Sequence, residues 1–393
     1  MKNNYKWIIL IIGVLAQITF SIGFSGIAVS SVIMQEVYKF EVNQLGFVLG
    51  CMGLGVALSE MIWGVVTDKI GDKAVLLIGL FLMAISYAYI AYMCVPVAGY
   101  YPDYRYLGGM LIITGMVGGS INSSSGHAVM SWFDDNTRGF AMSVRQTAVP
   151  IGAAIGSMVF PYIADQTGFK SAFLFMAILC LITFCIVTFG LKIKLNNNLV
   201  TQQEITELKS PYKRLSIWKI ALAGGALTIP QMAIMSFGAV YLMDVFQIKM
   251  LTISAIIAFI QLGGGIFRIV TGLISDKFKN RIQVICIISI ICSFSGILLA
   301  IISESNLYII VCLFITLGIA SNSWHGVGYT EIAVKSGIKY SGRALGMMGM
   351  LVFTISFLTP YFIPYILITY SWPAVWLFVG IMSITALPLI KNC

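Results

Sequence analysis

The chain has 393 residues, of which 59% are hydrophobic and 10% are charged, and its mean hydropathy is +0.94. A soluble domain carries about a quarter charged residues, because water must be met over its whole surface. This composition therefore excludes a soluble globule and indicates a membrane protein with two thin polar faces. The net charge of +9 would also suit a nucleic-acid-binding protein, but basic cytoplasmic loops explain it better.

Long apolar runs predict transmembrane helices, because lipid offers no hydrogen-bond partners and a helix pairs its own backbone groups. A membrane barrel would instead show alternating polar and apolar residues, which these runs lack. A span takes about 20 apolar residues, so the chain holds about twelve. The runs lie at roughly 7–33, 43–67, 74–96, 106–130, 140–164, 169–191, 217–243, 251–275, 282–303, 306–331, 342–368 and 372–390. The polar stretch 192–216 predicts a cytoplasmic linker between six-helix bundles at 1–191 and 217–393.

The first run follows Lys2 and Lys6 and continues to Ile33, which is too long for the apolar core of a signal peptide. We interpret it as the first spanning helix. The eight cysteines show no C-x-x-C spacing, and two histidines with scattered cysteines make no metal constellation. No phosphate-binding loop of an ATP-driven pump occurs. We therefore expect no metal, no cofactor and no catalytic residues.

Lysine and arginine are distributed unequally between alternate loops. With the N-terminus inside, 18 lie on the cytoplasmic side and 4 outside, and the remaining two, Arg145 and Arg268, fall within helices. Basic residues concentrate in cytoplasmic loops, so both termini are expected in the cytoplasm and the number of spans is even. We expect a multi-pass protein of a bacterial-type cytoplasmic (inner) membrane.

The same string follows the second and the eighth run. It reads G-x-x-x-D-K-x-x-x-[KR] in both places, 208 residues apart, and comprises Gly64, Asp68, Lys69 and Lys73 in one copy and Gly272, Asp276, Lys277 and Arg281 in the other. It resembles the loop signature of the major facilitator superfamily, although Asp72 stands where a basic residue is usual and the second copy lacks a glycine. The resemblance covers the whole chain. It implies an all-α fold of twelve helices in two bundles that rock about a mid-membrane site, and a monomer suffices.

The paired strings predict a gate. Gly64 and Gly272 allow close helix approach, while Asp68 and Asp276 lie where helices meet the cytoplasm and can pair with basic residues of the other half. A pair made in one state and broken in the other would act as a latch. Lys69, Lys73, Arg138, Lys277 and Arg281 are the other gating candidates. The alternative is that these are ordinary interfacial charges that set topology.

A few ionisable residues lie within the predicted spans, where each costs about 2.5–3.5 kcal/mol at a helix centre and is a functional candidate. Glu60 and Arg268 each precede their motif aspartate by eight residues, about 12 Å along a helix. Arg145 and Arg268 are predicted to bind substrate, and Glu60 or His325 to handle a proton. Two guanidiniums suit a carboxylate or phosphate substrate. Alternatively, Glu60 and Arg145 neutralise one another.

The resemblance also implies that the first, fourth, seventh and tenth helices line the cavity. These helices carry Gln17, Asn122, Gln231, Asn322 and Trp324, which we expect to contact substrate. The strings that begin at Asn122 and Asn322 echo one another. The alternative for each polar residue is a hydrogen bond between helices.

Two strings favour a branch of the superfamily. The residues from Arg138 to Gly152 resemble the fifth helix of carriers that import organic anions, nitrate or cyanate, and Trp324-His325-Gly326 with Glu331 resembles their tenth helix. The antiporter signature has a glycine at the position of Val149, so the resemblance to antiporters is partial.

The sequence thus predicts a non-enzymatic carrier in the lipid bilayer that moves a small organic anion, with a coupling proton or ion, by symport and alternating access. An exporter of amphiphilic or drug-like compounds is the alternative. The paired strings oppose a membrane enzyme or receptor, and nucleic acid is not an expected partner.

Overall fold

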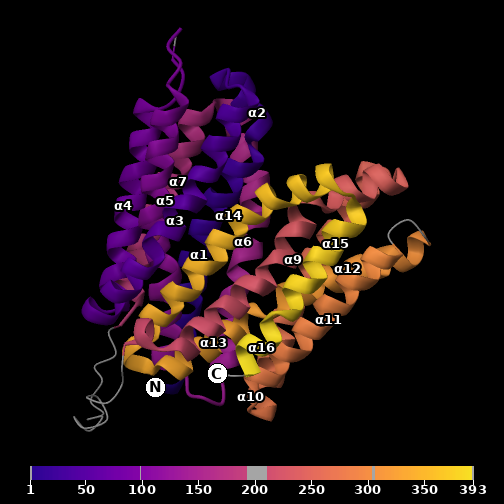
Figure 1. Cartoon of the computed structure of the whole chain (residues 1–393). Helices are drawn as coiled ribbons and strands as arrows, with labels where there is room; N and C mark the ends of the chain where they lie inside the picture. Colours follow the sequence, from indigo (N-terminus) through magenta and orange to yellow (C-terminus); the bar gives the residue numbers. More distant parts are fainter. Residues whose placement is uncertain (1, 98, 193–209, 303–305, 392–393) are drawn as a thin grey trace. The chain divides into compact units, whose positions relative to one another are not determined.

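The computed structural model describes residues 2–97, 99–192, 210–302 and 306–391, and within these ranges every regular element is a helix (Figure 1). The predicted linker 192–216 falls largely outside the described residues. Its described end is a short 3-10 turn, Pro211–Lys213, which leads into a helix at Leu215.

The first half of the sequence forms seven described helices. They are α1 (Lys2–Val29), α2 (Ser31–Tyr38), α3 (Val42–Ile70), α4 (Asp72–Met93), α5 (Tyr104–Trp132), α6 (Arg138–Thr167) and α7 (Phe169–Gly190). Tight connections separate some of them: Gly71 (φ 89°) joins α3 to α4 and Gly168 (φ 86°) joins α6 to α7. Only glycine adopts such positive φ angles at little cost, so these positions set the helix ends.

The second half also consists of helices. They are α9 (Leu215–Phe246), α10 (Met250–Phe278), α11 (Arg281–Ile301), α12 (Leu307–Ser323), α13 (His325–Ser336), α14 (Ser341–Thr369), α15 (Trp372–Ile384) and α16 (Ala386–Lys391), with a 3-10 turn at Ile338–Tyr340. The run predicted as one helix at 306–331 is interrupted at Trp324. The main-chain oxygens of Asn322 and Ser323 accept hydrogen bonds from the side chains of Arg268 (2.7 Å) and Thr271 (2.8 Å) on α10. Side-chain donors therefore compete for carbonyls that would otherwise continue the helix.

Eleven helical segments of the described chain are long and apolar enough to cross a membrane. The 29-residue helix α5 is not among them, although it occupies the place of the predicted fourth span. Its stretch from Gly118 to Gly126 is rich in glycine, serine and asparagine, which lowers hydropathy, and all of it is buried. The count of twelve spans thus stays a prediction that depends on α5.

The contacts between Cα atoms divide the chain into two compact units. The first comprises residues 1–134, 145–210 and 336–353, and the second comprises 135–144, 211–335 and 354–393. The units follow the two halves of the sequence except at two helix ends. The start of α6 belongs to the second unit, and the first half of α14 belongs to the first.

Small residues bring the helices of each unit into contact. In the first unit α3 packs along α5 and α4 lies beside α5 and α7 (Figure 1). A Cβ atom on Gly115 of α5 would overlap the main-chain oxygen of Met52 on α3. In the second unit a Cβ atom on Gly296 of α11 would lie 2.8 Å from the Cα atom of Gly380 on α15. Close backbone approach is how helices pack in lipid, where no hydrophobic force drives them together.

Candidate functional site

The first unit contains a buried polar cluster built from α1, α5 and α6. The side chain of Arg145 is 0% exposed. Its Nη2 atom donates to Gln17 Oε1 (2.9 Å), to the main-chain oxygen of Asn122 (2.8 Å) and to Ser125 Oγ (2.7 Å). Three residues predicted to bind substrate, Gln17, Asn122 and Arg145, therefore meet at one place. Ser125 belongs to the polar string that begins at Asn122 but was not among the predicted site residues.

Glu60 of α3 joins this cluster through Asn122. Its carboxylate is 0% exposed, and its Oε1 atom accepts a hydrogen bond of 2.9 Å from Asn122 Nδ2. Asn122 thus gives its side-chain amide to Glu60 and its main-chain oxygen to Arg145. Among the described residues, the other carboxylate oxygen, Oε2, has no hydrogen-bond partner.

The second unit contains a matching cluster from α9, α10 and α12. Arg268 is 1% exposed and donates to the main-chain oxygen (2.7 Å) and the side-chain oxygen (3.1 Å) of Asn322. Gln231 Nε2 donates to the same side-chain oxygen at 2.9 Å. The three residues that the sequence predicts for substrate in this half, Gln231, Arg268 and Asn322, are therefore also in contact.

The two clusters repeat one geometry with opposite charge. An ionisable residue eight positions before the motif aspartate, Glu60 or Arg268, contacts an asparagine of the facing helix, Asn122 or Asn322. An amide can serve both charges because it is donor and acceptor at once. Asn122 gives its N–H to the carboxylate, and Asn322 gives its oxygen to the guanidinium. The sequence indicated the equivalent depths of the charges, but the asparagine contacts appear only in the structure.

The interruption between α12 and α13 holds two further predicted residues. The rings of Trp324 and His325 stack with their centroids 4.2 Å apart, and the two residues are 0% and 7% exposed. His325 Nδ1 lies 3.2 Å from the main-chain oxygen of Asn322, which ties it to the Arg268 cluster. The indole N–H of Trp324 has no partner among the described residues. Both rings are thus fixed beside the cluster of the second unit.

Asp68 of the first unit caps the beginning of α14. Its carboxylate accepts hydrogen bonds from the main-chain N–H groups of Gly342 (2.8 Å) and Arg343 (3.1 Å), and Arg343 Nε lies 3.3 Å away. A carboxylate there satisfies orphan N–H groups and interacts favourably with the helix dipole. Gly64 permits this approach, since a Cβ atom on it would lie 2.5 Å from the oxygen of Gly342. Arg343 lies at the start of the eleventh predicted span but was not among the predicted gating residues.

Asp276 caps the beginning of α6 within the second unit in the same way. It accepts from the main-chain N–H groups of Gly139 (3.0 Å) and Phe140 (2.7 Å), and Gly139 in turn packs on Gly272. Arg281 Nη2 lies 2.8 Å from Asp135 Oδ1 and 4.0 Å from Asp276. The other close ion pairs of this cluster join Arg281 to Glu331 (4.0 Å) and Arg138 to Asp135 (3.9 Å). Asp135 was not among the predicted gating residues.

Residues 10–336 match the family model described as Major Facilitator Superfamily. The chain belongs to the major facilitator superfamily. An uncharacterised MFS-type transporter of Mycobacterium tuberculosis is 26% identical over 386 residues, which cover 98% of this chain and 84% of that protein. The chain is therefore a multi-pass membrane transporter of this superfamily.

Other transporters match part of the chain, and a solved structure shares its fold. A glycerol-3-phosphate transporter of Bacillus subtilis is 31% identical over 150 residues, 38% of this chain and 33% of that protein. The multi-drug resistance efflux pump PmrA of Streptococcus pneumoniae is 22% identical over 178 residues, 44% and 42% of the two chains. The structure of the proton:xylose symporter XylE bound to 6-bromo-6-deoxy-D-glucose has a TM-score of 0.77 at 15% identity and covers 100% of this chain and 96% of its own. This likeness shows the superfamily fold.

Not every predicted gating residue of the transporter reaches the clusters at Asp68 and Asp276. Lys69 and Lys277 are exposed. Lys73 Nζ donates to the main-chain oxygen of Thr188 at 2.8 Å, which ties α4 to α7. Asp72, the departure from the superfamily pattern, lies 3.8 Å from His127 Nδ1.

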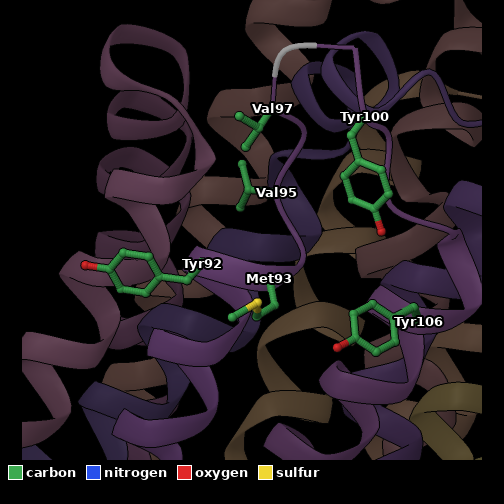
Figure 2. Close-up of a pocket in the computed structure, with 6 residues that line it drawn as sticks. All are labelled: Tyr92, Met93, Val95, Val97, Tyr100 and Tyr106. Carbon is green, nitrogen blue, oxygen red and sulfur yellow. The ribbon is translucent and has the colours of Figure 1, made fainter.

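A hollow of about 440 Å³ lies in the first unit, where α4 ends and α5 begins (Figure 2). It is lined by Tyr92, Met93, Val95, Val97, Tyr100 and Tyr106. No predicted site residue lines it, and its walls are aromatic and aliphatic. Exposed tyrosines of this kind are typical of the membrane–water interface.

Proposed function

We propose that this transporter carries a small organic anion by proton-coupled symport with alternating access. The observation that carries the proposal is the pair of buried guanidiniums, Arg145 and Arg268, on helices of the two units. Both donate to neutral oxygens, of Gln17, Asn122, Ser125 and Asn322. These acceptors orient the two guanidiniums, and guanidiniums bind carboxylate and phosphate groups through paired hydrogen bonds.

The remaining roles follow from the same clusters. We assign proton coupling to Glu60, with His325 as the second candidate, because both are buried beside the asparagines that hold the arginines. The clusters at Asp68 and Asp276 act as gates, and the bundles 1–191 and 217–393 move about the site. We also propose that the protein is a monomer of the cytoplasmic membrane with both termini inside.

Export of amphiphilic compounds is the competing function, and the partial match to PmrA is its support. Two buried arginines oppose it, since they would repel a cationic compound. The match to a glycerol-3-phosphate transporter, over a similar share of the chain, favours an anionic substrate instead.

Ligand-dependent melting tests the substrate class. The purified transporter in detergent is heated with members of a panel of carboxylates, phosphates, amino acids and lipophilic cations. A true ligand stabilises by about 2.7 kcal/mol at a hundredfold excess over Kd. We expect an anion to raise the melting temperature, and Arg268→Ala to abolish that rise. The exposed Arg105 offers a matched control, because Arg105→Ala leaves the buried cluster intact.

Stabilisation by lipophilic cations alone, unchanged in Arg268→Ala, would exclude the anion carrier and favour export. The anion that stabilises the protein is then used in proteoliposomes. Its accumulation under an inward proton gradient, and the loss of accumulation with a protonophore, are the results expected for symport.

A further inference from the structure

The first half of α14 lies on α3 through a stripe of glycines in the first unit. Gly342, Gly346 and Gly349 are spaced four and three residues apart, so they share one helix face. A Cβ atom on Gly342 would lie 2.8 Å from the main-chain oxygen of Gly64, and one on Gly346 would overlap the main-chain oxygen of Glu60. One on Gly349 would overlap the Glu60 carboxylate itself.

Two carboxylates of α3 mark the ends of this contact. Asp68 caps the first N–H groups of α14, and Glu60, two helical turns earlier on α3, lies beneath Gly349. The first is satisfied by two main-chain donors. The second has one donor, Asn122, while its Oε2 atom is buried against α14 without a hydrogen bond among the described residues. The glycine at 349 leaves room for that oxygen but offers it no donor side chain.

Side chains of α1, α5, α6 and α14 set the charge around Glu60. Arg145 of α6 acts on it electrostatically, and Asn122 of α5 stands between them as the hydrogen-bonded link. Gln17 of α1 is neutral and bonded to Arg145. On α14 the cation at this contact is Arg343, which is paired with Asp68 at the other end of the stripe.

We propose that Glu60 takes up one proton when the first half of α14 packs on α3, which we call the seated state of α14. This inference rests on the proposed role of Glu60 in coupling and supplies its physical link to movement. With α14 seated, ionisation would leave a charged oxygen buried without a donor, which is costly, whereas the neutral acid avoids that cost. When α14 leaves α3, the carboxyl loses its cover, meets water and releases the proton. Gly349 is the positioning residue, since a side chain there would keep α14 off the carboxyl.

Hydrogen–deuterium exchange of the whole transporter tests the link without any substrate. The quantity measured is the protection factor of peptides within 341–353, corrected for intrinsic exchange at each pH between 5.5 and 8.5. Since seating takes up one proton, protection is expected to fall as pH rises, by up to about tenfold per pH unit. In Glu60→Gln, which mimics the neutral acid, protection should be high and should not fall as pH rises.

Matched variants separate this link from general loosening. Glu36→Gln removes an exposed carboxylate and should keep the wild-type pH profile. Gly349→Ala should lower protection at every pH, whereas Gly109→Ala, whose added Cβ would meet nothing within 4 Å, should not. A pH profile of 341–353 that is the same in the wild type and Glu60→Gln would overturn the proposal. Because no solute is present, failure of the anion assay would leave this result unaffected, and the two ideas fail separately.

Discussion

Asparagine is the residue type on which both buried clusters depend. Asn122 and Asn322 lie where a helix of each unit faces an ionisable residue, and each contacts it through the half of the amide that suits the charge. The sequence predicted which polar and charged residues would lie within the spanning helices, because each stands out in an apolar run. It could not show which of them touch, since the contact depends on how α3 and α10 are rotated against α5 and α12.

Asn122→Ala is expected to destabilise the transporter by about 1–3 kcal/mol, because it removes the donor to a buried carboxylate. The melting temperature in detergent measures the effect. Glu60→Gln in the same chain should change that cost, because the hydrogen bond joins Asn122 to the side chain of residue 60. Equal losses with and without Glu60→Gln would show that Asn122 and Glu60 act independently. The exposed Gln166 provides a neutral comparison as Gln166→Ala.

At the scale of the helices, two contacts between elements are made at the first residues of a helix. The motif aspartates each cap a helix that belongs, by its sequence position, to the other half of the chain: Asp68 caps α14 and Asp276 caps α6. The repeated string predicted that these carboxylates would pair across the halves. It pointed to basic side chains, whereas the contacts found include main-chain N–H groups at both sites, which no sequence pattern marks.

Removal of a cap should loosen the helix that it holds. Asp68→Ala is expected to cost about 0.5–2 kcal/mol and to increase amide exchange at the start of α14, while α6 stays protected. Asp276→Ala should have the converse effect, on α6 alone. Asp165→Ala, an exposed carboxylate elsewhere in the chain, is the control. Unchanged exchange at both helix starts would show that these aspartates only set topology.

At the scale of the molecule, the distribution of basic residues predicts orientation and α5 decides the number of spans. If α5 crosses the membrane, a reporter that is active only on the extracytoplasmic side should function when inserted in 99–103 and fail when inserted in 133–137. A reporter at the C-terminal end should report the cytoplasm. Equal reporter activity in the two loops would show that they lie on the same side and that α5 does not cross the membrane.

The sequence by itself determined the membrane class, the helical fold and the family, because apolar runs and a string repeated after equivalent helices are local features of the chain. It also identified the buried charges, since a charge in an apolar run is conspicuous wherever it lies. Only the tertiary structure decided the rest. The interruption at Trp324, the exchange of the starts of α6 and α14 between the units, and the orphan oxygen of Glu60 beneath Gly349 all depend on which helix faces meet. In lipid that choice is made by close packing of small residues, and close packing is a property of pairs of helices rather than of either sequence alone.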